Sequence, residues 1–386
     1  MTARAVRHPG ELRWETRLLA TVTAVLVAFG IAATYGAASL VTVRGENVGP
    51  EFALRQLSGA AIGGALLLLA SRQDYWRWRQ LAWPILLGTL VLLAIPLLPF
   101  TQAVAPSING ARRWVDIGPL NFQPSEVARL AVVIWCAMLA SKKGDQVREF
   151  KKGVLPFISV LGLVSLLILL EPNLSMATLV ALLGGLVLFA SGARIGHFIL
   201  LAGCGVILVF HQIRDAQYRL ARLLTFLNPG DATTEAGFQI HQSLVGIGSG
   251  GFFGTGFGLG QQKLGYLPYA YSDFLFSTIG EEWGFIGVFA VVFLFALFCW
   301  LGFRIARTAS DPFGQYLAVG LTATIGLTAF MHMAVSLGLM PTTGLTLPFM
   351  SYGRSSQVIS LLGTGILINI GRLRGRARAA PARPEG

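Results

Sequence analysis

The sequence places a few ionisable side chains at the edges of long apolar segments. Asp273 comes directly before an apolar run that starts near residue 274, and Ser277 and Glu281 follow it at helical spacing. Ionisable groups in such segments are costly in a membrane and mark functional sites by default. A carboxylate at the mouth of a helix can act as a general base toward a substrate hydroxyl. The structural alternative is that Asp273 caps the helix that follows it.

A second pair of ionisable residues lies in the segment NFQPSEVARLAVV. Glu126 and Arg129 are three residues apart, so they share a helix face and can form an ion pair. Pro124 and Ser125 suit the start of that helix. A structural ion pair and a substrate contact fit this pattern equally well.

Basic residues near the apolar segments form a third candidate group. Arginine and lysine side chains bind phosphate and pyrophosphate, and arginine does so with two parallel hydrogen bonds. The alternative is that these residues are simply solvated. The candidates are Arg55, Arg214, Arg219, Arg222 and Lys263.

Metal and nucleotide chemistry have little support in the sequence. The three cysteines are isolated in apolar runs, and the five histidines form no HExxH motif, which disfavours a zinc hydrolase. The pattern GxxxxGK[ST], which grips nucleotide phosphates, is also absent. A substrate that is already activated on a lipid pyrophosphate fits the candidate carboxylate and arginines better.

The composition predicts the elements that must position these residues. The chain is 54% hydrophobic and 12% charged, with a mean hydropathy of +0.65, which is far too apolar for a soluble protein of 386 residues. We therefore expect an all-α polytopic membrane protein, a single integral membrane domain over residues 1–386 with about ten transmembrane helices. The predicted spans are about 17–39, 53–71, 80–100, 125–141, 154–170, 174–192, 195–212, 274–303, 313–338 and 350–371.

The distribution of basic residues predicts the orientation. If both termini are cytoplasmic, the cytoplasmic segments hold 20 of the 30 lysines and arginines. The tails 1–16 and 372–386 are then cytoplasmic, and 213–273 is a large extracytoplasmic loop between helices 7 and 8. This loop contains the glycine-rich run 246–260. Residues 338–356 are rich in proline, glycine and hydroxyl groups, which breaks the helical pattern at membrane depth and is tolerated only where the backbone lines a cavity or is buried.

Five segments, in this order, make the chain resemble the FtsW/RodA (SEDS) family, and its FtsW branch more than its RodA branch. They are GARRWVDIGPLNFQPSEVARLAVV, EPNLSMA, YRLARLLTFLNPGDATTEAGFQIHQSLVGIGSGGFFGTGFG, KLGYLPYAYSDFLFSTIGEEWGFIG and GLMPTTGLTLPFMSYGRSS. The resemblance implies a peptidoglycan glycosyltransferase in the bacterial cytoplasmic (inner) membrane, serving cell division or cell shape. It would polymerise lipid II on the extracytoplasmic side and release undecaprenyl pyrophosphate.

The resemblance also implies roles for individual residues. Asp273 matches the family's catalytic aspartate, and we expect it to act as the base. Substrate-binding positions of the family match Arg55, Glu126, Arg129 and Arg222, and weaker matches are Gln239 and Lys263. The chain departs from the family pattern at Asn173, Tyr269, Tyr271 and Arg354, which predicts substrate contacts or control by partners that differ from those of the family.

The family further implies a divalent cation (Mg²⁺ or Mn²⁺), although the sequence shows no ligand cluster for it. The implied partners are a class B penicillin-binding protein, which is a transpeptidase, and other membrane proteins of the divisome or elongasome. Two alternatives from other classes stay open on the sequence: a flippase for lipid-linked precursors, and a non-catalytic scaffold for division proteins.

Overall fold

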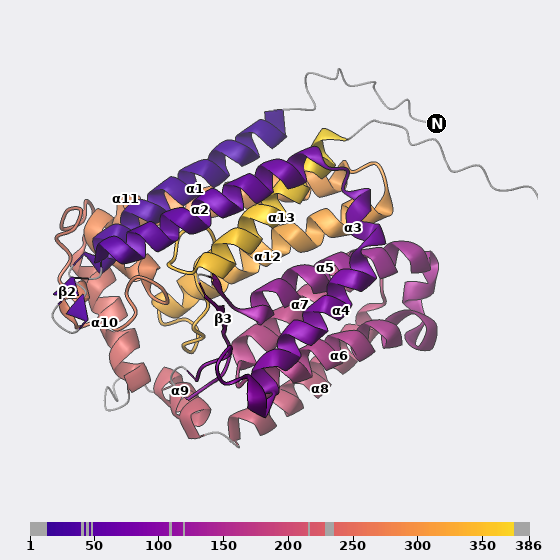
Figure 1. Ribbon diagram of the computed structural model, residues 1–386, viewed down its shortest axis with the longest axis horizontal. Helices are drawn as coiled ribbons and strands as arrows, with labels where there is room; N and C mark the ends of the chain where they lie inside the picture. The colour runs from indigo at the N-terminus through magenta and orange to yellow at the C-terminus, as the bar shows by residue number, and fades with distance from the viewer. Residues whose placement is uncertain are drawn as a thin grey trace, which may run out of the picture.

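The computed structural model is almost wholly helical (Figure 1). It describes residues 14–39, 42–43, 46–47, 49–107, 110–118, 120–214, 217–227 and 235–373. Most of the two predicted tails, residues 1–13 and 374–386, lies outside the described residues.

Each of the ten predicted spans coincides with a helix. These helices are α1 (Trp14–Ala38), α2 (Gly49–Arg72), α4 (Ala82–Ala94), α5 (Pro124–Lys143), α6 (Leu155–Leu170), α7 (Leu174–Ala190), α8 (Ile195–Arg214), α11 (Leu275–Arg307), α12 (Pro312–Ser336) and α13 (Arg354–Arg372). The described residues also form α3 (Trp76–Gln80), α9 (Gln217–Leu227) and α10 (Glu235–Ser249). Short 3-10 helices cover Ile95–Leu97, Pro99–Thr101, Gly144–Arg148 and Gln262–Leu264, and one π-helical turn covers Phe150–Val154.

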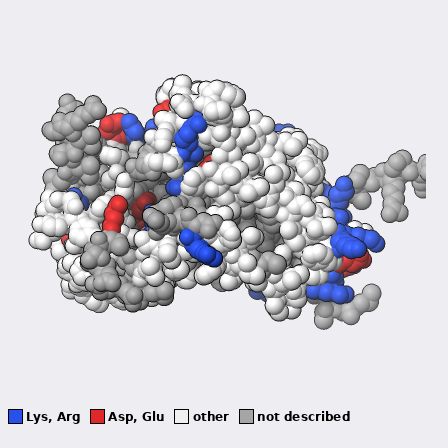
Figure 2. Space-filling view, turned by 90° about the horizontal axis from the view of Figure 1, so that it is seen from below, with Lys and Arg blue, Asp and Glu red and all other residues white. Residues whose placement is uncertain are grey.

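The described strands form two small antiparallel hairpins. Strand β1 (Thr42–Val43) pairs with β2 (Glu46–Asn47), and β3 (Val115–Ile117) pairs with β4 (Leu120–Phe122). In Figure 1, β2 and α10 lie at the left-hand end of the bundle, whereas α3 lies at the right-hand end. Figure 2 shows basic side chains gathered at that right-hand end.

Seven of the described helices have the length and apolar composition of a membrane span. Helix α4 with its extension to Leu97, and helix α7, are apolar but shorter. Helix α13 is less apolar than these nine helices. It lies inside the bundle, where its polar side chains are shielded from lipid. Its buried residues include Ser356, Gln357, Ser360, Thr364 and Asn369.

Small residues let α2 and α13 approach each other closely. A Cβ atom at Gly63 of α2 would lie 2.6 Å from a Leu361 methyl group of α13, and one at Gly365 would lie 2.4 Å from the Leu67 carbonyl oxygen. Close backbone approach through glycine is a usual way for helices to associate in membranes. This contact packs α2 directly against α13.

Helix α11 is interrupted at Gly284, whose backbone has φ 61° and ψ −157°, a conformation open only to glycine. The glycine-rich run packs against the break and provides new backbone hydrogen bonds. The Thr255 amide donates to the Glu281 carbonyl at 2.9 Å, and the Phe285 amide donates to the Gly251 carbonyl at 2.9 Å. The glycine-rich run 246–260 therefore supplies hydrogen-bond partners for backbone groups at the break in α11.

Candidate functional site

Asp273 lies in the turn before α11, at the end of the bundle opposite to α3. Its side chain is half-buried, and a Cβ atom on Gly344 would lie 3.7 Å from its Oδ2. Gly344 belongs to the irregular segment 337–353 between α12 and α13, which was predicted to interrupt the helical pattern. The carboxylate therefore faces the backbone of a segment that is more than sixty residues further along the chain.

The alternative role for Asp273, a helix cap, finds no support. Helix α11 begins at Leu275, and its N-cap residue is Phe274, which makes no side-chain cap, and not Asp273. The Asp273 backbone amide instead donates to the Tyr269 carbonyl at 3.0 Å, in a turn where Tyr269 has a positive φ of 57°. The side chain is thus left available for other contacts.

Arg222 provides positive charge near Asp273. It is exposed on α9, and its Nη1 donates to the Thr342 carbonyl at 3.3 Å, so it contacts the same irregular segment. Burial raises the pKa of Asp273 above its ordinary value, while the Ser272 hydroxyl and the Arg222 charge lower the pKa in part. A carboxyl group with a raised pKa is a better proton acceptor than an ordinary aspartate.

An aromatic cluster fixes the turn that carries Asp273. Tyr271 packs against Phe52 of α2 with ring centroids 4.6 Å apart and against Tyr352 with centroids 5.8 Å apart. The Tyr352 amide also donates to the Tyr271 carbonyl at 3.0 Å. Tyr271, a departure from the family pattern, therefore holds the Asp273 turn against α2 and the irregular segment.

The irregular segment is itself anchored to the first two helices. The Met350 carbonyl accepts from the Thr34 hydroxyl at 3.0 Å and from the Gln56 amide at 3.2 Å. On α12, the His332 Nδ1 lies 2.8 Å from the Leu345 carbonyl oxygen. The sequence reasoning missed these anchors because each joins residues far apart or residues with no motif of their own.

Glu126 and Arg129 form the ion pair predicted from their spacing. Glu126 Oε2 lies 2.8 Å from Arg129 Nε, and both residues are buried. Arg129 Nη2 also donates to Ser360 Oγ at 3.1 Å and to the Ser356 carbonyl at 3.3 Å, which joins α5 to α13. Helix α5 begins at Pro124, as predicted. The pair has a clear structural role, and its predicted substrate contact stays a prediction.

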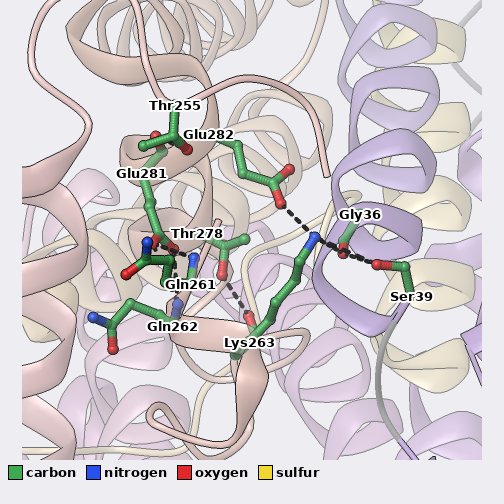
Figure 3. A network of polar contacts seen from close by, with 10 residues as sticks. Gly36, Ser39, Thr255, Gln261, Gln262, Lys263, Thr278, Glu281 and Glu282 are labelled. Carbon is green, nitrogen blue, oxygen red and sulfur yellow. Dashed lines mark hydrogen bonds and ion pairs between the residues drawn. The ribbon is translucent and has the colours of Figure 1, made fainter. Parts of the chain in front are cut away.

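Lys263 lies in a buried network with α1 and α11 (Figure 3). Its Nζ is 3.1 Å from Glu282 Oε1, 3.1 Å from the Gly36 carbonyl and 3.4 Å from Ser39 Oγ. Next to it, Glu281 accepts from the backbone amides of Gln261 and Gln262 at 2.6 and 3.2 Å. The substrate contact predicted for Lys263 stays untested, but all its observed contacts hold the loop to the bundle.

Two other predicted site residues lie on α2 and α10. Arg55 is exposed on α2, pairs with Glu51 one turn earlier, and also bonds to the side chain of Tyr352 in the aromatic cluster beside Asp273. The Gln239 side chain lies on α10 and donates to Glu235 at 3.4 Å. Of the further basic candidates, Arg214 is exposed at the end of α8, and the side chain of Arg219 lies outside the described residues.

The sequence reasoning passed over Glu171, which directly follows α6. Its side chain is buried, and neither carboxylate oxygen has a hydrogen-bond partner among the described residues. Burial raises the pKa of Glu171 to about 8, although the Arg113 charge opposes this shift. Arg113 donates to the Glu171 carbonyl at 3.0 Å. Asn173, another departure from the family pattern, caps α7 by accepting from the Met176 amide at 3.2 Å.

The described residues do not gather the ligands of a metal site. Among them, no group of three or more His, Cys, Asp and Glu side chains could hold an ion. A divalent cation therefore stays a prediction of the resemblance, and no step proposed below depends on it.

Comparisons with known proteins agree with this architecture. Residues 16–375 match the family model FTSW_RODA_SPOVE, described as "Cell cycle protein". The chain is 39% identical to the "Probable peptidoglycan glycosyltransferase FtsW" of Geobacter sulfurreducens, over 91% of this chain and 93% of that protein. It is 35% identical to the "Stage V sporulation protein E" of Bacillus subtilis, over 92% and 96%.

Two solved structures are similar over most of their length. One is a chain from "Structural coordination of polymerization and crosslinking by a peptidoglycan synthase complex", with a TM-score of 0.75 and 28% identity, covering 93% of this chain and 98% of that chain. The other is the rod shape determining protein RodA of Thermus thermophilus, with a TM-score of 0.65 and 28% identity, covering 93% and 97%. The family match, the relatives and the shared fold together show that this multi-pass membrane protein belongs to the FtsW/RodA/SpoVE family.

Proposed function

We propose that this protein is a peptidoglycan glycosyltransferase that polymerises lipid II, with Asp273 as the general base. The observation that carries this proposal is the half-buried Asp273 carboxylate beside the positive charge of Arg222. The names of the most similar relatives give the reaction class.

The proposed reaction needs one proton acceptor and one stabilised leaving group. The 4-hydroxyl of the acceptor sugar attacks the anomeric carbon of the lipid-linked donor, and Asp273 accepts the hydroxyl proton. The new glycosidic bond forms as the bond from the anomeric carbon to the pyrophosphate oxygen breaks, and the bonding electrons leave with undecaprenyl pyrophosphate. Arg222 is exposed near Asp273 and suits stabilisation of that negative charge.

We further propose that the reaction takes place at the extracytoplasmic surface of the cytoplasmic membrane. Basic side chains gather at the end of the bundle that carries α3, which supports a cytoplasmic position for that end (Figure 2). Asp273 lies at the other end, where an extracytoplasmic lipid-linked sugar could reach it. We further propose a class B penicillin-binding protein as the partner, on the analogy of the similar peptidoglycan synthase complex.

The test is polymerisation of lipid II by the purified protein, followed on gels, with and without the transpeptidase partner. Asp273→Asn should lower the polymerisation rate by about 10²- to 10⁴-fold, which is the usual contribution of a general base. Asp145→Asn is the matched control, because Asp145 is an exposed carboxylate in the connection between α5 and α6. Normal polymerisation by Asp273→Asn would refute the role of this residue.

The same preparations separate the two alternative functions. A flippase would move labelled lipid II across vesicles without forming polymer. A scaffold would bind its partner but would neither move lipid II across the vesicle membrane nor polymerise it. In both cases Asp273→Asn would leave the measured behaviour unchanged.

A further inference from the structure

An open cleft lies between α4, α5 and α6, at the end of the bundle away from Asp273. Its volume is about 530 Å³, within the range of small-molecule sites. The residues that decide its chemistry are Trp83, Trp135, Lys142, Lys143, Ser159 and Val160. None of them belongs to the candidate site described above.

The cleft is basic at one end and apolar along its length. Lys142 and Lys143 are the last two residues of α5. Trp135 lies about two turns before Lys143, about 12 Å away along the helix axis. Trp83 of α4 and Val160 of α6 form apolar walls. A ligand of this cleft should therefore have an anionic head and an apolar body.

The two lysines keep their positive charge free for a ligand. Among the described residues, neither lysine has a carboxylate within the 4.0 Å limit of an ion pair. Lys143 Nζ donates to the Lys152 backbone carbonyl at 2.5 Å, which holds the amine in place without neutralising it. Lys142 is exposed at the rim.

Trp135 adds a buried donor that the described part of the protein does not satisfy. The residue is 1% exposed and packs edge-on against Trp83, with ring centroids 5.5 Å apart. Its indole N–H has no acceptor among the described residues. A buried donor without an acceptor is costly. Because this nitrogen is itself buried, Trp135 contributes to the cleft as an apolar wall beside Trp83.

We propose that this cleft is a binding site for an anionic phospholipid. The lysines would bind the phosphate group, and the walls formed by α4 and α6 would hold the glycerol backbone and the upper acyl chains. Basic pockets between transmembrane helices are known to bind anionic lipid head groups in this way. The site is separate from the one that carries Asp273, so it does not depend on the proposed function.

The test is a titration of the full-length protein in neutral detergent with short-chain phosphatidylglycerol, followed by native mass spectrometry. Detergent removes the charged membrane surface, so the dissociation constant reports on the site alone. Phosphatidylcholine of the same chain length tests the need for negative charge, and inorganic phosphate tests whether an anion without chains competes. We expect phosphatidylglycerol to bind more tightly than phosphatidylcholine and millimolar phosphate not to displace it.

Two variants and one control locate the site. Lys142→Gln/Lys143→Gln should weaken phosphatidylglycerol binding roughly 30-fold, since each lysine near a lipid phosphate contributes about a factor of five. Ser159→Trp should weaken it by filling the cleft, and Ser159 is exposed, so the fold should tolerate the change. The control Lys151→Gln/Lys152→Gln removes the same charge from exposed side chains outside the cleft and should leave binding unchanged.

Three outcomes would overturn the proposal. Equal affinity for phosphatidylglycerol and phosphatidylcholine would mean that only ordinary boundary lipid occupies the cleft. Displacement by inorganic phosphate would indicate a simple anion site. An equal loss of binding in the control would mean that the attraction is a property of the whole basic end.

Discussion

Replacing Lys263 by methionine should strongly destabilise the protein. The side-chain atoms of Lys263 and Glu282 are at most 1% exposed, and the ammonium lies 3.1 Å from Glu282 Oε1. Glu282 Oε2 has no hydrogen-bond partner among the described residues. Removal of the ammonium would therefore leave a whole carboxylate buried and unpaired.

The expected loss of stability is about 3–5 kcal/mol, which is typical when one partner of a buried ion pair is removed. Native proteins are stable by only about 5–15 kcal/mol, so this loss is large. The double variant Lys263→Met/Glu282→Gln removes the unpaired charge and should recover most of the stability. About 1–2 kcal/mol should stay lost, because the Gly36 carbonyl and Ser39 hydroxyl lose a donor.

The assay is unfolding of the four proteins of this double-mutant cycle in mixed micelles of increasing SDS content, followed by tryptophan fluorescence. A Lys263→Met variant within about 1 kcal/mol of the original protein would refute the reasoning, since removal of the cation paired with a buried carboxylate should cost more than that. Failure of the double variant to recover would also refute it. If the double variant folds normally but no longer binds lipid II, the substrate contact predicted for Lys263 is correct.

Three further predictions concern pH, the break in α11 and the buried carboxyl group beside Arg113. Because a base works only when deprotonated, polymerisation should rise with pH through the pKa of Asp273, and the pH profile should place this inflection above the ordinary aspartate value of about 3.9. Gly284→Ala should destabilise the protein by at least about 1–3 kcal/mol, because an added Cβ would lie 2.4 Å from the Gly254 nitrogen and the backbone conformation excludes alanine. The control Gly162→Ala lies in α6 with open space around it and should be neutral or slightly stabilising in the same unfolding assay. Since the pKa of Glu171 is about 8 in the folded protein and about 4.3 in the unfolded chain, stability should fall as pH rises from about 4 to 8. Glu171→Gln should remove this fall in stability. The variant should be more stable than the original protein at pH 8 by up to a few kcal/mol and little different at pH 5. Equal unfolding curves at pH 8 would contradict the raised pKa of Glu171.

The amino-acid sequence by itself determined the helices and the contacts within them. Apolar runs predicted ten of the described helices, and the spacing of Glu126 and Arg129 predicted their ion pair. The start of α5 at Pro124 also followed from the sequence. These features depend on residues within one or two helical turns of each other, so a linear pattern contains the necessary information.

Only the tertiary structure decided which distant residues meet. Lys263 bonds to Gly36, which is 227 residues away, and Arg222 bonds to Thr342, which is 120 residues away. The sequence presented both cations as phosphate ligands, but packing buried Lys263 beside Glu282 and left Arg222 exposed near Asp273. The difference arises because helix packing sets the burial of each charge and the identity of its partner, and no single helical segment contains either piece of information.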